Sequence, residues 1–201
     1  MNKRRERQYK RNFVDYTSHY WIVDPLDGSL NLHHSIPLSC VSIALWKRQA
    51  PVMGIVYDFN HNDLFIGAAE QVEGICDKKG AWLNGNPIKT SPVKESNSGI
   101  LSTGFPSWRS YDENSLKKFV QRIQEWKKIR LIGSAALSLA WVACGKFDAY
   151  IEEDIRIWDV AAGLALVKAA GGDVYFKVNE RPNFVTAIAT NGKIEVEELI
   201  L

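Results

Sequence analysis

The spacing of its apolar segments most restricts the folds that this chain can adopt. Three runs rich in apolar and β-branched residues follow one another closely, over residues 39–46, 51–57 and 63–69. Turn residues bound each run, so we expect three strands that pair as antiparallel neighbours. Another buried strand is predicted over residues 99–104, so the first half of the chain is expected to be built mainly of strands.

The second half of the chain changes to helical spacing. Asp112 or Asn114 can cap a helix whose apolar residues share one face, namely Leu116, Phe119, Val120, Ile123 and Trp126. Asn191 is predicted to cap a final short helix. Between these points, strands and helices are predicted to alternate: a strand near 129–132, a helix over 134–145, a strand over 147–151, a helix over 158–170 and a strand over 184–189.

Strands followed by alternating helices and strands predict a layered α+β fold in which the sheet is covered on its faces. The 201 residues include 46% hydrophobic and 24% charged side chains, which is typical of a globular domain and excludes a disordered or fibrous chain. We divide the chain into a basic N-terminal arm, residues 1–20, and a single domain, residues 21–201. Residues 1–11 carry a net charge of +5. We interpret them as a solvated terminus, with nucleic-acid binding as the alternative.

Two further observations concern the environment of the protein. The longest nearly apolar run, residues 135–144, is far shorter than the roughly 20 residues that cross a bilayer. The N-terminus lacks the apolar stretch of a signal peptide, and Cys40, Cys76 and Cys144 form no metal-binding spacing. We therefore expect a reduced, cytoplasmic protein without a membrane segment.

One candidate site lies where an apolar strand ends, in the segment WIVDPLDGSLN over residues 21–31. The strand ends at Asp24, because Pro25 cannot continue the hydrogen-bonded ladder, and Asp27 follows three residues after Asp24. Two carboxylates at close range stay ionised only beside a cation, so the pair favours a hard metal such as Mg²⁺. The carbonyl of Leu26 lies between them and could be a further ligand.

The same segment has a second interpretation. Gly28 lets the backbone approach a ligand closely, and the amides of Gly28 and Ser29 at a helix start suit a phosphate oxygen. However, Asp, Pro, Gly and Ser are also ordinary turn residues, so Asp24 and Asp27 could simply form a turn and an N-cap. The segment alone leaves both interpretations open.

A second group of candidates lies in the helical half. Asp159 falls in the first turn of the helix predicted over 158–170, where it could act as a cap without any further function. Upstream, Gly133, Ser134 and Ala135 form a glycine-to-helix junction, and Glu152 interrupts the end of an apolar strand. Small residues at that junction would admit a ligand to the backbone, but they would equally allow close helix packing.

Taken together, these segments resemble a known family. The stretches WIVDPLDGSLN, IRLIGSAALSLAWVACGKFDAYIE and IWDVAAGLALVKAAGG are similar, in order and spacing, to the inositol monophosphatase family of metal-dependent phosphatases. The connecting stretches SCVSIALW, PVMGIVYD, GAWLNGNPI and LSTGFP resemble it as well. The resemblance covers residues 21–191 and implies the layered αβαβα sandwich of this family, without its N-terminal helices.

The resemblance also implies a metal site and a reaction. It implies that Asp24 bridges two Mg²⁺ sites, that the Leu26 carbonyl completes one, and that Asp27 and Asp159 complete the other. The metals would activate a water for in-line attack on phosphorus, with no phosphoenzyme. Asp27 and Ser29 would be the catalytic residues, since Ser29 replaces the family's threonine and keeps a hydroxyl that can orient the water.

The implied substrate is inositol monophosphate or a related small polyol or sugar phosphate. The resemblance implies that the Gly28 and Ser29 amides grip its phosphate and that four further residues form the wall around its hydroxyl-bearing part: Gly133, Ser134, Ala135 and Glu152. His33 and His34 could contact an anionic substrate, although solvent-facing histidines are the simpler interpretation.

The chain departs from the family pattern at several points. Ser138 replaces a usual Asp and Ala169 a usual Glu, both outside the implied metal shell. The family's upstream Glu-Glu metal motif has only Glu6 as a counterpart, between arginines. Without N-terminal helices, apolar sheet surface would be uncovered, which favours association into a homodimer. The alternative function is therefore a truncated, catalytically weak or inactive member that acts as a binding or structural protein.

Overall fold

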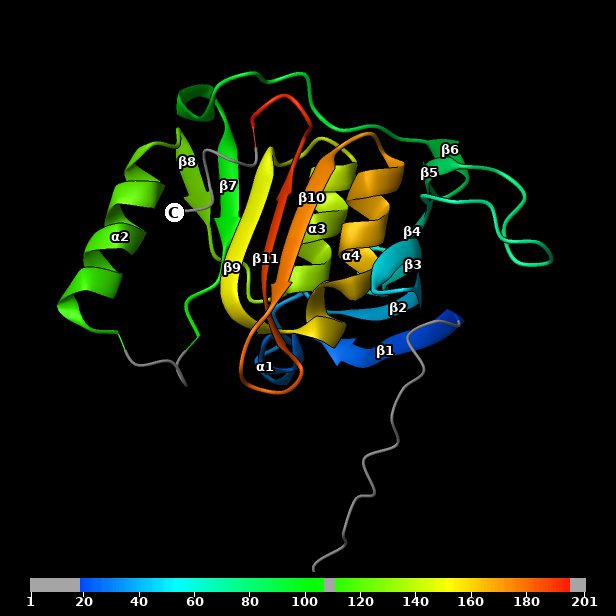
Figure 1. The fold of residues 1–201 in the computed structure, drawn as a ribbon, viewed down its shortest axis with the longest axis horizontal. Coiled ribbons are helices and arrows are strands. Elements are labelled where there is room, and N and C mark those ends of the chain that lie inside the picture. Colours follow the sequence, from blue (N-terminus) through cyan, green and yellow to red (C-terminus); the bar gives the residue numbers. More distant parts are fainter. Residues whose placement is uncertain (1–18, 107–110, 196–201) are drawn as a thin grey trace, which may run out of the picture.

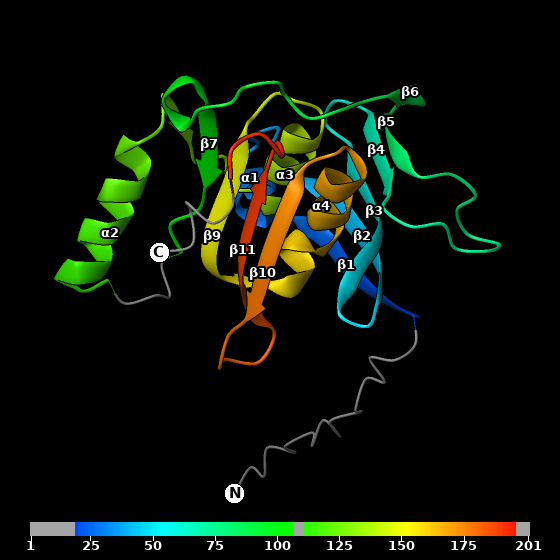
Figure 2. The ribbon, with the colours of Figure 1, turned by 45° about the horizontal axis from the view of Figure 1, so that its top comes forward.

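A computed structural model describes residues 19–106 and 111–195. These residues form a stack in which a six-stranded sheet, a layer of two helices, a five-stranded sheet and an outer helix follow one another (Figures 1 and 2). The predicted layered α+β architecture is thus confirmed. The basic residues 1–11 and Glu6 lie outside the described residues, so the division at residue 20 stays a prediction.

The first sheet contains the close-spaced strands of the N-terminal half. Its neighbouring strands follow the chain order and are all antiparallel, as predicted for residues 39–69. Asn84 and Gly85, both at positive φ, form the two-residue turn that joins its last two strands. The strands are β1 (His19–Asp27), β2 (Cys40–Lys47), β3 (Ala50–Asp58), β4 (Asp63–Ala68), β5 (Gly80–Leu83) and β6 (Asn86–Pro87).

The second sheet has the order β10-β11-β9-β7-β8, with β7 parallel to both of its neighbours. The strand over residues 173–178 was not predicted from the sequence. It pairs as a hairpin with the strand that follows it, which was predicted. The strand predicted over 147–151 also continues further, to residue 156. The strands are β7 (Ile100–Thr103), β8 (Lys128–Arg130), β9 (Ala149–Arg156), β10 (Asp173–Val178) and β11 (Phe184–Thr190).

Helices α3 (Ala135–Ala143) and α4 (Ile157–Ala169) lie between the two sheets (Figure 2). Both are apolar around most of their circumference, as expected for helices that are covered on all sides. A Cβ atom added to Gly163 would lie 2.3 Å from the Cβ of Leu139, so the two helices approach too closely for any larger residue there. The largest apolar core of the molecule forms around this pair, with side chains from both sheets.

Helix α2 (Glu113–Gln124) lies on the opposite face of the second sheet and is capped by Asp112, which accepts a hydrogen bond from the amide of Ser115. The predicted apolar face is only partly buried: Leu116 and Val120 are 41% and 43% exposed. The predicted apolar face therefore extends beyond the surface that the sheet covers. The helix contacts the sheet through a narrow stripe that includes Ile123, and no α2 residue is fully buried.

The outer face of the first sheet carries several exposed apolar side chains. Trp21 and Val23 of β1 are 53% and 50% exposed, and Tyr57 and Leu64 on β3 and β4 are also exposed. Among the described residues, no helix covers this face (Figure 2). This agrees with the expectation of uncovered sheet surface, while the homodimer itself stays a prediction.

Three short elements complete the description: α1 (Ser29–His33), the 3-10 helix η1 (Ser96–Ser98) and the segment after β11. In that segment the Asn191 side chain accepts hydrogen bonds from the amides of Lys193 and Ile194, as a helix cap would. Residues 191–195 are nevertheless not helical, and the rest of the predicted final helix lies outside the described residues. No helix in the described ranges is long and apolar enough to cross a membrane.

Candidate metal centre

A cleft of about 660 Å³ opens at the end of β1, beside the starts of α1, α3 and α4. It brings together the candidate residues of β1, α1, α3, α4 and β9 that were identified from the sequence, whereas His33 and His34 lie outside it. Residues from positions more than 130 apart in the chain thus meet at one place because the layered fold brings the ends of their elements together. The predicted residues that line the cleft are Asp24, Leu26, Asp27, Gly28, Ser29, Gly133, Ser134, Ala135, Glu152 and Asp159.

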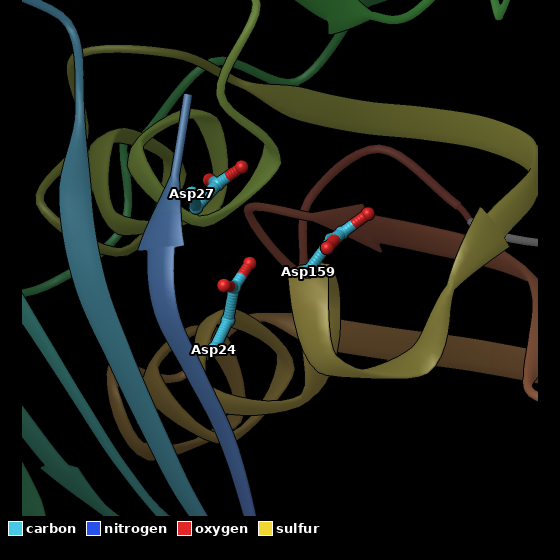
Figure 3. Close-up of side chains that lie close together, drawn as sticks. All are labelled: Asp24, Asp27 and Asp159. Atoms are coloured by element: carbon cyan, nitrogen blue, oxygen red, sulfur yellow. The ribbon is translucent and has the colours of Figure 1, made fainter. Parts of the chain in front are cut away.

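Three carboxylates meet in this cleft. Asp24 and Asp27 project from β1 and Asp159 from the start of α4, and their side chains point into the same space (Figure 3). One oxygen of each lies within 4.8 Å of the others. Such a spacing allows a single cation to contact all three.

A β-bulge explains how Asp24 and Asp27 reach the same side. Residues three apart in a regular strand point to opposite faces of the sheet. Between Asp24, opposite Ser42, and Asp27, opposite Cys40, β1 has one more residue than β2, and the register shifts. This bulge occurs at Pro25, which cannot donate a hydrogen bond to the ladder. It turns both carboxylates toward the cleft.

Asp27 is fixed by the start of α3. Its Oδ2 accepts hydrogen bonds from the Ser134 hydroxyl, at 2.6 Å, and from the Ala136 amide, at 2.8 Å. Burial raises the pKa of Asp27 to about 6, although both hydrogen bonds favour its charged form. The residue at the N-cap of α1 is Gly28 at φ 77°, which makes no side-chain cap bond. The interpretation of Asp27 as a simple N-cap is therefore wrong.

Asp159 lies in the first turn of α4, as predicted, but the N-cap position belongs to Arg156. Burial, followed by the nearby charges of Asp27 and Asp24, raises the pKa of Asp159 well above that of a free carboxyl group. Carboxylates crowded together in this way are stabilised when a cation neutralises them. The electrostatics of the cluster therefore favour a bound cation.

The oxygens of the cluster suit a hard divalent cation. Ser134, Ala136 and, at 4.0 Å, the Cys40 thiol donate to Oδ2 of Asp27, and the amide of Leu26 donates to Oδ1 of Asp24 at 3.0 Å. Leu26 itself lies in the cleft wall. Ions such as Mg²⁺ prefer carboxylate and carbonyl oxygens of this kind, so these residues fit the cation that the sequence analysis expected.

The opposite wall of the cleft is formed by β9 and β7. Glu152 accepts a hydrogen bond of 2.7 Å from the Tyr150 hydroxyl, and burial raises the pKa of Glu152 to about 7. A Cβ atom on Gly104 would lie 2.1 Å from a Glu152 carboxylate oxygen, so a larger residue at position 104 would displace the carboxylate of Glu152. This wall therefore offers a buried hydrogen-bonding group to whatever lies over the three aspartates.

The side chain of Asn31 joins two loops at the mouth of the cleft. Its Nδ2 donates to the carbonyl of Leu38 and to that of Ile132, each at 2.8 Å. Ile132 directly precedes Gly133, so this contact holds the start of α1 against the loop that leads into α3. Together with the bond from Ser134 to Asp27, it fixes the floor of the cleft.

The structure adds cleft residues that the sequence analysis did not assign. Tyr150, Thr103 and Arg156 all line the cleft. Tyr150 stands two residues before Glu152 on the same strand, and this period of two could have identified it as a neighbour. Arg156, whose guanidinium lies 5.1 Å from the centre of the Trp158 ring, carried no comparable signal.

Other candidates lie apart from the aspartates. Ser138, in place of the usual Asp, lines the cleft but donates its hydroxyl to the Ser134 carbonyl, at 2.7 Å, within α3. His33 and His34 are exposed and are not among the residues that line the cleft, which agrees with solvent-facing histidines. Neither feature changes the three-aspartate cluster.

Comparison with known proteins finds relatives over most of the chain. The sequence model of the inositol monophosphatase family matches residues 5–195, nearly the whole chain. The chain belongs to the inositol monophosphatase family. Its structure superposes on an inositol monophosphatase from Anabaena with a TM-score of 0.75 and 38% sequence identity, covering 89% of this chain and 69% of that one.

Curated relatives within the inositol monophosphatase family carry two kinds of name. The chain is 42% identical over 155 residues to the Nus factor SuhB of Xylella fastidiosa, covering 77% of this chain and 54% of that protein. It is 38% identical over 184 residues to an inositol-1-monophosphatase of Synechocystis, covering 88% of this chain and 60% of that protein. The chain thus spans less than two thirds of the length of these relatives.

Proposed function

We propose that this protein hydrolyses phosphate monoesters of small polyols or sugars, such as inositol monophosphate, with Mg²⁺ as cofactor. The observation that carries the proposal is the convergence of Asp24, Asp27 and Asp159 in one cleft of an inositol monophosphatase family member. The relative from Synechocystis is named an inositol-1-monophosphatase, and the proposal extends that activity to this chain.

In this proposal the three aspartates and the Leu26 carbonyl would hold Mg²⁺. The cation would supply the charge that polarises the phosphoryl group and would activate a water for in-line attack. The hydroxyl of Ser29 orients that water, and Asp27, fixed by α3, keeps its own ligand oxygen directed into the cleft.

The remaining cleft residues bind the substrate in this proposal. The amides of Gly28 and Ser29 donate hydrogen bonds to the phosphate group, since both residues line the cleft beside the aspartates. Glu152 accepts hydrogen bonds from the hydroxyl groups of the substrate, and the start of α3 forms the adjacent wall through Gly133, Ser134 and Ala135. A polyol phosphate carries both the phosphate and the hydroxyl groups that these two parts of the cleft would bind.

Two further expectations belong to the proposal. We place the activity in the cytoplasm, which the three free cysteines support, since a reducing compartment keeps thiols unpaired. We also expect two copies to associate through exposed apolar surface such as that around Trp21 and Val23. Small phosphorylated molecules, and not nucleic acids, are the expected ligands.

A phosphate-release assay with inositol monophosphate tests the proposal. We expect turnover that depends on added Mg²⁺ and that disappears in Asp24→Asn. Asp173→Asn serves as the matched control, because Asp173 is an exposed aspartate at the start of β10, outside the cleft. Absence of metal-dependent turnover above the Asp24→Asn background would refute the enzyme function and favour the binding or structural alternative.

A further inference from the structure

Strand β9 contains a bulge between two residues of the cleft. Two residues of β9, Glu153 and Asp154, lie opposite the single residue Thr186 of β11, so the pairing register shifts between Glu152 and Ile155. We call Glu153 and Asp154 the β9 bulge. An extra residue reverses the face of the sheet to which the following side chains point. Glu152 and Ile155, three residues apart, accordingly both line the cleft.

The backbone of Asp154 has an uncommon conformation. Its φ is 55°, in the left-handed region that non-glycine residues seldom adopt. Aspartate tolerates this region better than most residues, because its short polar side chain can form local hydrogen bonds. Such conformations persist where the surrounding structure holds them, and they are concentrated at functional sites. The β9 bulge therefore needs a partner that holds Asp154.

That partner is Asn179, which directly follows β10. Its Nδ2 donates a hydrogen bond of 2.5 Å to Oδ1 of Asp154, and its Oδ1 accepts one of 3.3 Å from the Thr186 hydroxyl. Its backbone amide donates to the Phe184 carbonyl at 2.9 Å, which fixes Asn179 on the β10–β11 hairpin. Both ends of one side-chain amide thus tie the β9 bulge to this hairpin.

Glu152 is the polar cleft residue that adjoins the β9 bulge. The Tyr150 hydroxyl, 2.7 Å from Oε2, holds the end of its side chain, whereas the bulge sets the backbone from which the side chain projects. The space around the carboxylate is narrow, since a Cβ atom on Gly104 would lie 2.1 Å from one of its oxygens. A small shift of the β9 backbone would therefore misplace the carboxylate.

The three aspartates are held by other parts of the structure. Asp24 and Asp27 belong to β1, and Asp27 is fixed by the Ser134 hydroxyl at the start of α3. Asp159 belongs to α4, in which residues 160–167 are all buried. The β9 bulge therefore supports the wall of the cleft at Glu152 and not the aspartate cluster.

We propose that Asn179 is a positioning residue for substrate recognition: through Asp154 it fixes the β9 bulge and thereby the place of Glu152 in the cleft. The β10–β11 hairpin thus controls the affinity for the hydroxyl-bearing part of the substrate, although none of the residues of β10 and β11 lines the cleft. This inference rests on the proposed function and adds to it a residue that acts from outside the cleft.

Steady-state kinetics with Mg²⁺ tests the inference, with inositol monophosphate as substrate and inorganic phosphate, which lacks the hydroxyl-bearing part, as inhibitor. In Asn179→Ala we expect the KM to rise about five- to tenfold, the effect of one hydrogen bond. The kcat and the inhibition constant of phosphate should stay unchanged, because the aspartate cluster does not depend on the bulge. Glu180→Ala, at the next residue, which is exposed, is the control and should change none of these values.

Three further variants separate positioning from a general loss of stability. Asp154→Asn should keep the native KM, because asparagine also tolerates the left-handed region and its side-chain oxygen can accept the bond from Asn179. In a Glu152→Ala background, Asn179→Ala should raise the KM no further, since both substitutions remove the same contact. Thr186→Val keeps the β-branched shape and removes only the hydroxyl that orients Asn179, so it should raise the KM by less; it replaces Asn179→Ala if that variant does not fold.

The outcomes separate this inference from the proposed function. An unchanged KM in folded Asn179→Ala, or in Thr186→Val in its place, would overturn the inference. An equal rise in the KM and in the inhibition constant of phosphate, or additive effects of Asn179→Ala and Glu152→Ala, would overturn it too, because the change would then not act through Glu152. Each of these results leaves the proposed function standing. A native protein without Mg²⁺-dependent turnover would refute the proposed function and the inference with it.

Discussion

The two helical layers of this molecule are packed very differently. In α3, eight of nine residues are buried, and α3 meets α4 at Gly163, where no larger residue fits. In α2, no residue is fully buried, and a narrow stripe that includes Ile123 packs against the sheet. The comparison teaches that the part of the cleft with the three aspartates is built into the core, whereas α2 is held by few buried side chains.

The same difference appears in individual side chains. Asp27 is held by the hydroxyl of Ser134 and the amide of Ala136, both at the start of the buried α3. Arg122 of α2 has one carboxylate partner and a buried Nε without an acceptor. We therefore expect substitutions near α3 and α4 to affect the chemistry or the fold, and substitutions on α2 to have smaller effects.

The largest expected effect is the loss of cation binding in Asp159→Asn. The amide cannot supply the anionic oxygen, so Mg²⁺ binding and phosphate release should fall by more than about a hundredfold, beyond the loss seen for supporting residues. The fold should persist, since Asp159 is not the N-cap of α4 and the substitution removes charge repulsion from the cluster. Titration calorimetry with Mg²⁺ and circular dichroism check the two parts.

Asp173→Asn is the control for this substitution, because Asp173 is exposed and removed from the cleft. Unchanged Mg²⁺ affinity in Asp159→Asn would contradict the assignment of Asp159 as a ligand. Unfolding of Asp159→Asn would show that the start of α4 needs the carboxylate for structure.

The second prediction concerns pH and metal removal. Burial raises the pKa of Asp27 to about 6 and that of Glu152 to about 7, above the usual values of 3.8 and 4.5. The folded protein therefore holds protons that the unfolded chain has released, and the metal-free protein should lose stability as the pH rises from about 4 to about 7. Thermal unfolding in EDTA at several pH values measures this trend.

Added Mg²⁺ should oppose that loss at pH 8, because the cation replaces protons at the aspartates. A concentration about 100-fold above the dissociation constant would stabilise the fold by about 2.7 kcal/mol. A melting temperature that rises with pH without metal, or one that Mg²⁺ leaves unchanged at pH 8, would contradict the electrostatic description of the cluster.

The third prediction addresses the packing contrast directly. In Gly163→Ala the new Cβ would lie 2.3 Å from the Cβ of Leu139, so α3 and α4 must move apart. We expect the free energy of unfolding to fall by about 1–3 kcal/mol, as for other overpacked cores. Leu116→Ala on α2, where the side chain is 41% exposed, should change it by less than about 0.5 kcal/mol. Urea denaturation curves measure the free energy of unfolding of the two variants. Equal decreases in Gly163→Ala and Leu116→Ala would contradict the difference in packing between the two helical layers.

The smallest effect is expected in Ser134→Ala, since Ser134 positions Asp27 and does not belong to the carboxylate cluster. Its hydroxyl favours the charged form of Asp27, so its removal should raise the pKa of Asp27 further above about 6. Activity should fall about tenfold, and the acidic limb of the pH–rate profile should move to higher pH. A loss of activity without any shift of the acidic limb would indicate that Ser134 has only a structural role.

Much of the fold was predictable because the pattern of apolar residues along the chain indicates which segments are buried. The close-spaced strands are apolar runs bounded by turn residues, and the apolar runs around Ser138 and Ala165 are long enough for helices and end at glycines. The strand over residues 173–178 was missed, since its residues are only partly buried or exposed and give weak alternation. The exposure of Leu116 and Val120 was missed as well, because periodicity finds an apolar face but does not show whether a sheet covers it.

The candidate site was predictable residue by residue but not as a geometry. Asp24 and Asp27 could be selected as a pair, whereas the bulge that turns both toward the cleft depends on pairing with β2. Arg122 on α2 donates a hydrogen bond to Glu153 on β9, which lies 31 residues away in the sequence. No local pattern contains such a pairing, so it could only come from the folded structure.

The two hydrogen bonds of Asn31 have a consequence for motion. A five-residue helix such as α1 would ordinarily fray on its own. Asn31, however, ties it to Leu38 and to Ile132, the latter 101 residues away. The loop that carries Gly28 and Ser29 therefore cannot swing outward unless the entry to α3 moves with it. Product release from this cleft would then require a concerted displacement of two loops. The rates of amide hydrogen exchange in the two loops should therefore rise or fall together.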